Sequence, residues 1–353
     1  MSNNFSSKVL IDCFHYGQSR GISIYTNNLI DNINSNPHLK NIKFYLLVNK
    51  KLSIDVTSKN IKVIKLPKLN IIVWEQLIVP LIAILYRADK VHYLGNTFSP
   101  LIKSLIVSIH DVSYLKKDIN ISGPISFKQY VGKFYRQILL KYFHFLIKKV
   151  ITVSDFAKND IVKELGYSAK KVNVVPNIVS QNYLEPINWK KKQNIILIVT
   201  GNTKQKNIDL TLQYLQKIDL NEFKVDVIGI KKNNYKNFCF HNSISHYEMK
   251  DFYNKSKILL IPSLYESFSI PSIEASARGC LIVSSKHGAI SQTIDNEGFF
   301  YEPQKFESLK KILEESKTFL EEKKAKEILT YRAKKVERYS QQSLFEDISR
   351  IYL

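Results

Sequence analysis

The sequence predicts an α/β protein with two domains, each built on a parallel sheet. Short apolar runs typical of buried strands alternate with longer helical patterns along the chain, and this alternation favours helices layered over parallel sheets. The length of 353 residues exceeds what a single core usually fills. A polar stretch at 181–193, which contains Pro186 and three consecutive lysines, is interpreted as the linker between the domains.

The N-terminal domain is expected to span residues 1–180. Apolar runs in it predict strands at 8–13, 44–48, 61–66, 91–93, 105–109, 151–153 and 172–175. Helices are expected at 22–34 and around 74–86. A further helix is expected after Ser154, whose side chain is suited to an N-cap.

The second domain is expected to span residues 194–335, and residues 336–353 are expected to form a C-terminal helix. Buried-strand patterns in the second domain lie at 195–200, 224–228, 258–261 and 281–284. From Glu307 onward the pattern is mostly helical and highly charged.

The most informative stretch is 263–280, with the sequence SLYESFSIPSIEASARGC. Glu266 and Glu274 stand eight positions apart in it, with Pro271 between them. The apolar run just before predicts a strand, residues 264–270 a loop, and Pro271 is tolerated in the first turn of a helix. One carboxylate is therefore expected on a loop at the strand's carboxyl end, and the other in the opening turn of the helix.

Between these carboxylates lies a helix N-terminus, whose free backbone N–H groups suit a phosphate. Carboxylates are good acceptors for sugar and ribose hydroxyls. A sugar nucleotide has this layout, with a diphosphate between two hydroxyl-rich rings. A structural interpretation stays open, because a glutamate in the first turn of a helix is often a capping residue.

The whole stretch resembles the E-x7-E signature of the retaining glycosyltransferases of family 4. It matches the signature at Glu266, Phe268, Pro271, Glu274, Ala275, Ala277 and Gly279. It departs at Ser267 and Ser269, where glycine is usual in the family. A positive φ at either serine would be strained, which puts donor affinity in question.

Further segments resemble the same family and follow its order along the chain. They are residues 21–33, 74–77, 106–115, 151–166, 172–179, 199–210 and 284–294. Three positions depart from the family pattern: Ser23 replaces a glycine, Gln205 an arginine and Gln292 a glutamate. Because Gln205 replaces a cation expected near the donor phosphates, we expect the replacement to affect the rate of turnover more than the fold.

The resemblance implies the GT-B fold, in which two Rossmann-like domains with parallel sheets face each other across a cleft. The N-terminal domain of such proteins binds the acceptor and the C-terminal domain binds the nucleotide-sugar. The last helix commonly crosses back onto the first domain, and residues 336–353 are expected to do so.

The resemblance also assigns catalytic roles to Glu266, His110 and Lys206. Glu266 is expected to hold hydroxyls of the transferred sugar, and Lys206 to neutralise the leaving diphosphate. His110, at a strand's carboxyl end, is expected to approach the donor sugar. Structural alternatives remain, because His110 could be a satisfied core histidine beside a capping Asp111, and Lys206 could be a solvated loop lysine.

A set of donor-binding residues is implied in the same way: Gly21, Asn202, Lys206, Phe268, Ser269, Ile270 and Glu274. Glu274 is expected to accept the ribose hydroxyls. Gly21 is expected to let backbone approach a diphosphate closely at a helix N-terminus. No metal site or cofactor is expected, because the chain contains no D-x-D triplet.

Three classes of partner could explain the net charge of +21: nucleic acid, an anionic membrane and an anionic substrate. Nucleic acid is not favoured, because the basic residues are spread out and no nucleic-acid module is recognised. An anionic membrane surface is favoured, and residues 127–150 are the candidate contact because apolar and basic residues mix there at helical spacing. The alternative is a core helix with a solvated basic edge. The apolar run at 71–86 is too short to cross a bilayer.

These observations together predict a cytoplasmic enzyme located peripherally on the inner face of the plasma membrane. Its cysteines are scattered and its N-terminus does not resemble a signal peptide. Its expected partners are a nucleotide-sugar donor and a lipid-linked saccharide acceptor, and its expected reaction is retaining, metal-independent transfer of a hexose-type sugar in surface polysaccharide biosynthesis. The alternative is a degenerate, non-catalytic partner subunit of another transferase.

Overall fold

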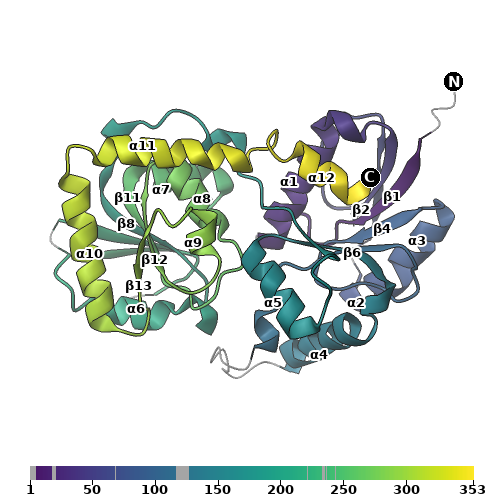
Figure 1. The fold of residues 1–353 in the computed structure, drawn as a ribbon, viewed down its shortest axis with the longest axis horizontal. Helices are drawn as coiled ribbons and strands as arrows, with labels where there is room; N and C mark the ends of the chain where they lie inside the picture. Colours follow the sequence, from purple (N-terminus) through teal and green to yellow (C-terminus); the bar gives the residue numbers. More distant parts are fainter. Residues whose placement is uncertain are drawn as a thin grey trace. The chain divides into compact units, whose positions relative to one another are not determined.

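The computed structural model describes residues 5–17, 21–67, 69–116, 127–220, 222–232, 235, 237–242 and 244–353. The chain divides into two compact units, each an α/β unit on a parallel sheet, as the sequence predicts (Figure 1). The first unit contains the described residues within 1–116 and 124–178, together with Gln341–Leu353. The second unit contains the described residues of Val179–Ser340.

The first unit is built on a seven-stranded sheet in the order β3-β2-β1-β4-β5-β6-β7. Its strands are β1 (Ser7–Asp12), β2 (Ile42–Asn49), β3 (Ile61–Leu66), β4 (Lys90–Tyr93), β5 (Leu105–Ser108), β6 (Ile147–Thr152) and β7 (Val172–Val174). Every pairing in the sheet is parallel. The predicted strands are confirmed, although β6 begins earlier than expected, at Ile147.

Helices cover both faces of this sheet. On one face lie α1 (Gly21–Ser35) and α12 (Phe345–Tyr352). The other face is covered by the π-helical turn η2 (Trp74–Ile78), α3 (Val79–Leu85), α4 (Phe127–Tyr142) and α5 (Asp155–Leu165). The short helix α2 (Ile71–Val73) precedes η2 and has no buried residue. Alternate side chains of each strand enter the two cores: Val9 packs with the α1 side and Leu10 with the α4 side.

The C-terminal helix α12 belongs to the first unit. Its Tyr352 hydroxyl lies 2.9 Å from Nδ1 of the buried His92 on β4, and Lys149 on β6 donates to the Ile351 carbonyl at 3.1 Å. The helix expected over 336–353 starts only at Phe345. Residues 336–339 instead form a 3-10 turn of the second unit, which ends because Ser340 has an extended backbone.

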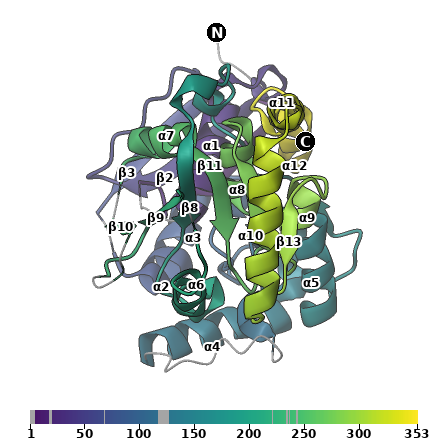
Figure 2. The same cartoon turned by 90° about the vertical axis from the view of Figure 1, so that its left-hand side faces the viewer.

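The second unit is built on a six-stranded parallel sheet in the order β10-β9-β8-β11-β12-β13. Its strands are β8 (Gln193–Val199), β9 (Lys224–Ile228), β10 (Phe238–His241), β11 (Ser256–Ile261), β12 (Leu281–Ser285) and β13 (Phe299–Tyr301). Its helices are α6 (Ile208–Leu215), α7 (His246–Lys255), α8 (Ile270–Ala277), α9 (Ile290–Thr293), α10 (Phe306–Glu321) and α11 (Ala325–Lys335). Figure 2 shows α10 lying along the sheet beside β13.

Candidate active site

Three loops meet at the carboxyl edge of the second sheet. They follow β8, β11 and β12, which are neighbours in the sheet, so their carboxyl ends share one edge. The Leu264 amide donates to the Gln205 carbonyl at 2.8 Å, and the Ala289 amide donates to the Glu266 carbonyl at 2.7 Å. Open parallel α/β sheets bind ligands at this edge. Four residues from three loops are thus fixed to one another where a ligand is expected.

Lys206 and Glu266, two of the residues predicted to be catalytic, form an ion pair at this edge. Lys206 ends the 3-10 turn η7 (Lys204–Lys206) after β8, and its Nζ lies 2.6 Å from Glu266 Oε1. The side chains are 32% and 15% exposed, so the lysine is reachable from solvent. The pair places a cation and a sugar-hydroxyl acceptor side by side.

Gln205, which stands where the family usually has arginine, has a structural role. Its side-chain amide donates to the Tyr265 carbonyl at 2.8 Å, which ties the loop after β8 to the loop after β11. Asn202, predicted to bind the donor, lies exposed on the same loop. Lys206 therefore sits on a loop that Gln205 anchors.

Glu274 is buried in α8, with only 5% of its surface exposed. The Tyr253 hydroxyl on α7 donates to its Oε2 at 3.1 Å. Burial raises the pKa of Glu274 to about 8, and this hydrogen bond opposes the shift. The prediction of a first-turn position is wrong, because α8 begins at Ile270 and Glu274 falls in its second turn. A role as a helix cap is thereby excluded.

The start of α8 carries the strain that the sequence analysis anticipated. Ser269, its N-cap residue, has φ 74° and ψ 80°, a left-handed conformation that favours glycine. Its carbonyl accepts from the Ser272 hydroxyl at 2.7 Å. Phe268 is buried and packs edge-on against Tyr339, with ring centroids 5.4 Å apart. Ile270, also predicted to bind the donor, is partly exposed at the first position of the helix.

Gly288 is a site residue that the sequence analysis missed. It lies in the loop after β12 with φ +93°, and an added Cβ would stand 2.5 Å from the Glu266 carbonyl oxygen. Only glycine allows this loop to lie against the backbone of Glu266. The signal in the sequence was a glycine in the 284–294 segment, but the contact to Glu266 joins residues far apart in the chain.

His110 lies at the carboxyl edge of the first sheet, after β5. Its backbone amide donates to Asn96 Oδ1 at 2.7 Å, and its ring Nε2 lies 2.9 Å from the Leu94 carbonyl oxygen. Because a carbonyl only accepts, Nε2 carries the proton and Nδ1 is left as an acceptor. Burial lowers the pKa of His110, which favours the neutral ring.

Asp111 and Gly21, for which the sequence analysis also gave expectations, lie in the first unit as well. Asp111 Oδ1 accepts from the Ser113 amide at 3.2 Å and from the Ser113 hydroxyl at 2.8 Å, but the N-cap residue of this 3-10 turn is Val112, so Asp111 is not its N-cap residue. Gly21 is the first residue of α1, and a Cβ added there would meet none of the described residues within 4 Å. Nothing in the fold itself therefore requires glycine at this position.

A buried pair of carboxyl groups in the first unit was not anticipated. The sequence analysis gave the 74–77 segment no chemical role, yet Glu75 in it is buried and accepts from Tyr135 at 3.0 Å. Asp12, at the end of β1, accepts from Trp74 Nε1 at 2.8 Å. Burial raises the pKa of Glu75 to about 7 and that of Asp12 to about 6.

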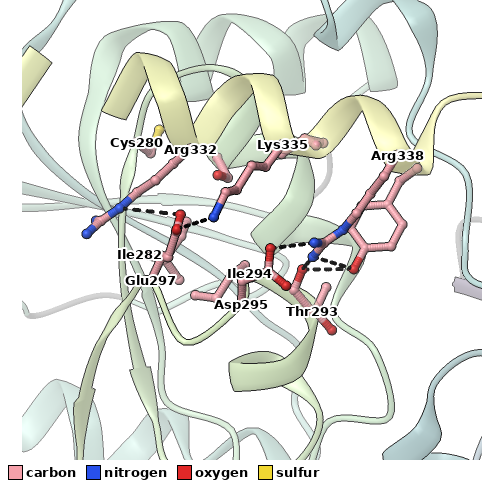
Figure 3. Close-up of a pocket in the computed structure, with 12 residues that line it drawn as sticks. Cys280, Ile282, Thr293, Ile294, Asp295, Glu297, Arg332, Lys335 and Arg338 are labelled. Carbon is pink, nitrogen blue, oxygen red and sulfur yellow. Dashed lines mark hydrogen bonds and ion pairs between the residues drawn. The ribbon is translucent and has the colours of Figure 1, made fainter. Parts of the chain in front are cut away.

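The recess drawn in Figure 3 lies elsewhere in the second unit, between the α8–β12 region and α11. Its charged side chains pair with one another: Glu297 bridges Arg332 and Lys335, and Asp295 pairs with Arg338. None of the predicted site residues lines it. We interpret this recess as a structural contact between packed elements and not as the donor site.

Two family models match the chain on consecutive stretches. The Glycosyltransferase Family 4 model matches residues 55–182, and the model of glycosyl transferases group 1 matches residues 179–336. Together the two models cover residues 55–336, so both structural units match glycosyltransferase families. The boundary between the matches falls next to the division between the two structural units.

Curated relatives of this chain include two named mannosyltransferases. The MMP alpha-(1->4)-mannosyltransferase of Mycolicibacterium hassiacum is 28% identical over 43% of this chain and 40% of its own length. The O-antigen chain mannosyltransferase of Salmonella typhimurium is 26% identical over 58% of each chain. The matches thus span about half of the length of these relatives.

Solved structures match over nearly the whole chain. A glycosyltransferase involved in lipopolysaccharide biosynthesis has a TM-score of 0.71 at 16% identity and covers 97% of this chain and 99% of its own. An Anabaena protein solved in complex with UDP-glucose has a TM-score of 0.68 at 13% identity, with 98% of both chains covered. These likenesses confirm the predicted GT-B fold.

Proposed function

We propose that the chain is a retaining glycosyltransferase that moves a hexose-type sugar from a nucleotide-sugar to a hydroxyl of a lipid-linked glycan. The observation that carries the proposal is the Lys206–Glu266 pair at the carboxyl edge of a parallel sheet. The names of the mannosyltransferase relatives and of the lipopolysaccharide enzyme support a place in the biosynthesis of O-antigen, lipopolysaccharide or capsule. The UDP-glucose complex supports a nucleotide-sugar donor.

Lys206 stabilises the diphosphate charge in this proposal. As the bond from the anomeric carbon to the phosphate oxygen breaks, negative charge grows on the diphosphate, and a fixed cation stabilises it. Before the donor binds, Glu266 holds the lysine in position at 2.6 Å. When the diphosphate forms an ion pair with Lys206, the Glu266 carboxylate becomes free to accept hydrogen bonds from hydroxyls of the transferred sugar.

Retention follows from attack on the same face that the diphosphate leaves. The acceptor oxygen forms a bond to the anomeric carbon, the bond to the phosphate oxygen breaks, and the acceptor's proton passes to that phosphate oxygen. No carboxylate nucleophile is needed, which agrees with Glu274 being buried against Tyr253. Glu274 serves the nucleotide instead, as acceptor for the ribose hydroxyls.

In this proposal His110 and Gly21 of the first unit keep the roles that the family resemblance implies. Nδ1 of His110 is left as an acceptor and is suited to a hydroxyl of the donor sugar. Gly21 leaves open space at the start of α1, which suits close approach of a phosphate. Transfer is proposed to be metal-independent, because Lys206 and backbone amides supply the charge that a metal would otherwise supply.

The proposal is tested by the division of roles between the glutamates. Glu274→Ala should weaken nucleotide binding by about 1–3 kcal/mol, because it removes a hydrogen-bond acceptor. Glu266→Ala should lower kcat more than nucleotide affinity. Release of nucleoside diphosphate from a panel of nucleotide-sugars, and calorimetric titration with the nucleotides, measure both. Equal losses of nucleotide affinity in the two variants would contradict the assignment, and loss of turnover in EDTA with recovery in Mn²⁺ would contradict metal independence.

A second candidate is a non-catalytic partner subunit of another transferase. The observation that favours it is the strained Ser269, where the family usually has glycine. The same titration separates the candidates, because a degenerate site would neither bind a nucleotide nor hydrolyse a donor.

A further inference from the structure

The segment α2–η2–α3 of the first unit presents apolar side chains to solvent as well as to the core. Its exposed positions are Ile72, Val73, Leu77, Leu81, Ile84 and Leu85. Glu75 is the only charged residue between positions 71 and 86, and it is buried. A surface helix of a globular protein usually carries polar residues on its outer face. An outer face made entirely of aliphatic side chains therefore marks an interaction surface.

Helix α4 extends this face. The Gln76 amide in η2 donates to the Tyr135 hydroxyl on α4 at 2.5 Å, and that hydroxyl donates to Glu75. Both segments pack on the same core, and both figures show α2 beside α4. Among the side chains of α4 that the structure describes, those from 130 to 142, the exposed apolar ones are Tyr130, Val131, Phe134 and Tyr142. We call the exposed apolar side chains of 72–85 and 130–142 the apolar surface.

Basic residues stand at the margins of the apolar surface. Lys133 and Lys141 lie on α4, and Arg87 follows the end of α3. Lys62 on β3 lies over the ring of Tyr86, 4.9 Å from its centroid. Residues 127–150 contain six lysines and arginines and no acidic residue. An aliphatic face with a basic margin complements an anionic lipid surface, where cations meet phosphates and apolar groups enter the acyl region.

We propose that the apolar surface seats the first unit on an anionic lipid bilayer, with the α2–α3 face inserted at the boundary between headgroups and acyl chains. No helix among the described residues is long and apolar enough to cross a membrane, so these helices lie in the plane of the bilayer surface. A second copy of the chain is a poorer occupant, because a symmetric contact would bring two basic margins together. The inference does not depend on the transferase activity, since lipid binding needs no nucleotide.

Vesicle flotation of the full chain tests the apolar part of this surface. Vesicles of phosphatidylcholine alone are compared with vesicles that also contain phosphatidylglycerol. The wild type should bind the anionic vesicles and lose binding as salt rises. Leu81→Ser and Ile84→Ser should each weaken binding by about tenfold, because each removes an aliphatic side chain from the acyl region. Tyr331→Ser, which removes an exposed apolar side chain from the second unit, is the matched control and should bind as the wild type does.

A charge reversal tests the basic margin. Lys133→Glu with Lys141→Glu should abolish the preference for anionic vesicles. Lys310→Glu with Lys323→Glu makes the same change of net charge in the second unit and should leave most of the binding intact. Equal loss in both pairs would overturn the proposal, because net charge alone would then explain binding. The proposal would also be overturned if the wild type bound neither kind of vesicle. A wild-type dimer in sedimentation that Leu81→Ser dissociates would overturn it as well.

Discussion

Ser269 holds a left-handed backbone that glycine would adopt without steric cost. Its φ is 74°, and its Cβ is the source of the strain. Ser269→Gly should raise the free energy of unfolding by about 1 kcal/mol, as measured by urea denaturation. Ser267→Gly is the control, because Ser267 has no positive φ and glycine there relieves no backbone strain. A variant at 269 that is less stable than the wild type would show that the serine hydroxyl outweighs the strain.

Glu274 makes nucleotide affinity depend on pH. Its pKa is raised to about 8 by burial, so at pH 6 the side chain is mostly protonated in the free protein. Ribose hydroxyls donate to the ionised form, so binding releases a proton and affinity should rise between pH 6 and pH 8, by at most about tenfold per unit. Calorimetric titrations over this range measure it. Glu274→Gln is the control, because ionisation of the nucleotide phosphate is the same in both proteins. If affinity depends on pH in the same way in the variant and in the wild type, Glu274 does not bind the ribose.

Among the loops, the one after β12 fixes the backbone of Glu266 through Gly288. Gly288→Ala places a Cβ 2.5 Å from the Glu266 carbonyl oxygen, so one of the two loops must move. A displacement of about 1 Å at a reacting group can cost on the order of a hundredfold in rate, so kcat should fall that far. Gly166→Ala, at the end of α5, is the control because it has a similar positive φ with nothing within 4 Å. If both variants lose stability but neither loses kcat, Gly288 is a fold residue and not a site residue.

The π-helical turn η2 carries a buried carboxyl whose ionisation opposes folding. The pKa of Glu75 is raised from 4.5 to about 7, chiefly by burial and then by the charge of Asp12. The folded state therefore holds a proton that the unfolded state has lost, and stability should fall as pH rises from about 4.5 to about 7. The loss amounts to about 3 kcal/mol if the whole shift is realised.

Glu75→Gln removes this titration. The free energy of unfolding is measured by urea denaturation at pH 4.5 and at pH 8. The wild type should lose about 3 kcal/mol more than the variant between these two pH values. Glu321→Gln makes the same change at an exposed position and serves as the control. A parallel pH dependence in Glu75→Gln and the wild type would show that Glu75 does not ionise in this range.

At the scale of the whole molecule, patterns local in sequence were predictable and contacts distant in sequence were not. Apolar runs located the central strands of both sheets. The edge strands β10 and β13 were missed, because they are short and only partly buried. The start of β6 was missed because Lys148 and Lys149 interrupt its apolar pattern.

In the candidate site, too, residues in local sequence motifs were predictable and contacts between distant residues were not. Two separate segments that resemble the family, 263–280 and 199–210, located Glu266 and Lys206, and the structure brings their side chains to 2.6 Å from each other. The fit of Gly288 against Glu266 could not be read from spacing, because it arises where two loops converge. Residues 127–150 were left open between a membrane contact and a core helix. Helix α4 packs its inner side on the core, as the core-helix interpretation expects, and the membrane contact stays a prediction.

The proposed reaction requires that the second unit bind a nucleotide at the edge where Lys206 and Glu274 lie. Thermal unfolding with UDP, GDP, dTDP, CDP and ADP, on the wild type and on Glu274→Ala, tests this binding. One nucleotide should raise the melting temperature of the wild type, because a ligand at about 100 times its Kd stabilises by about 2.7 kcal/mol. The same nucleotide should give a much smaller shift with Glu274→Ala. The absence of a shift with every nucleotide, or an equal shift in the variant, would contradict the proposed binding.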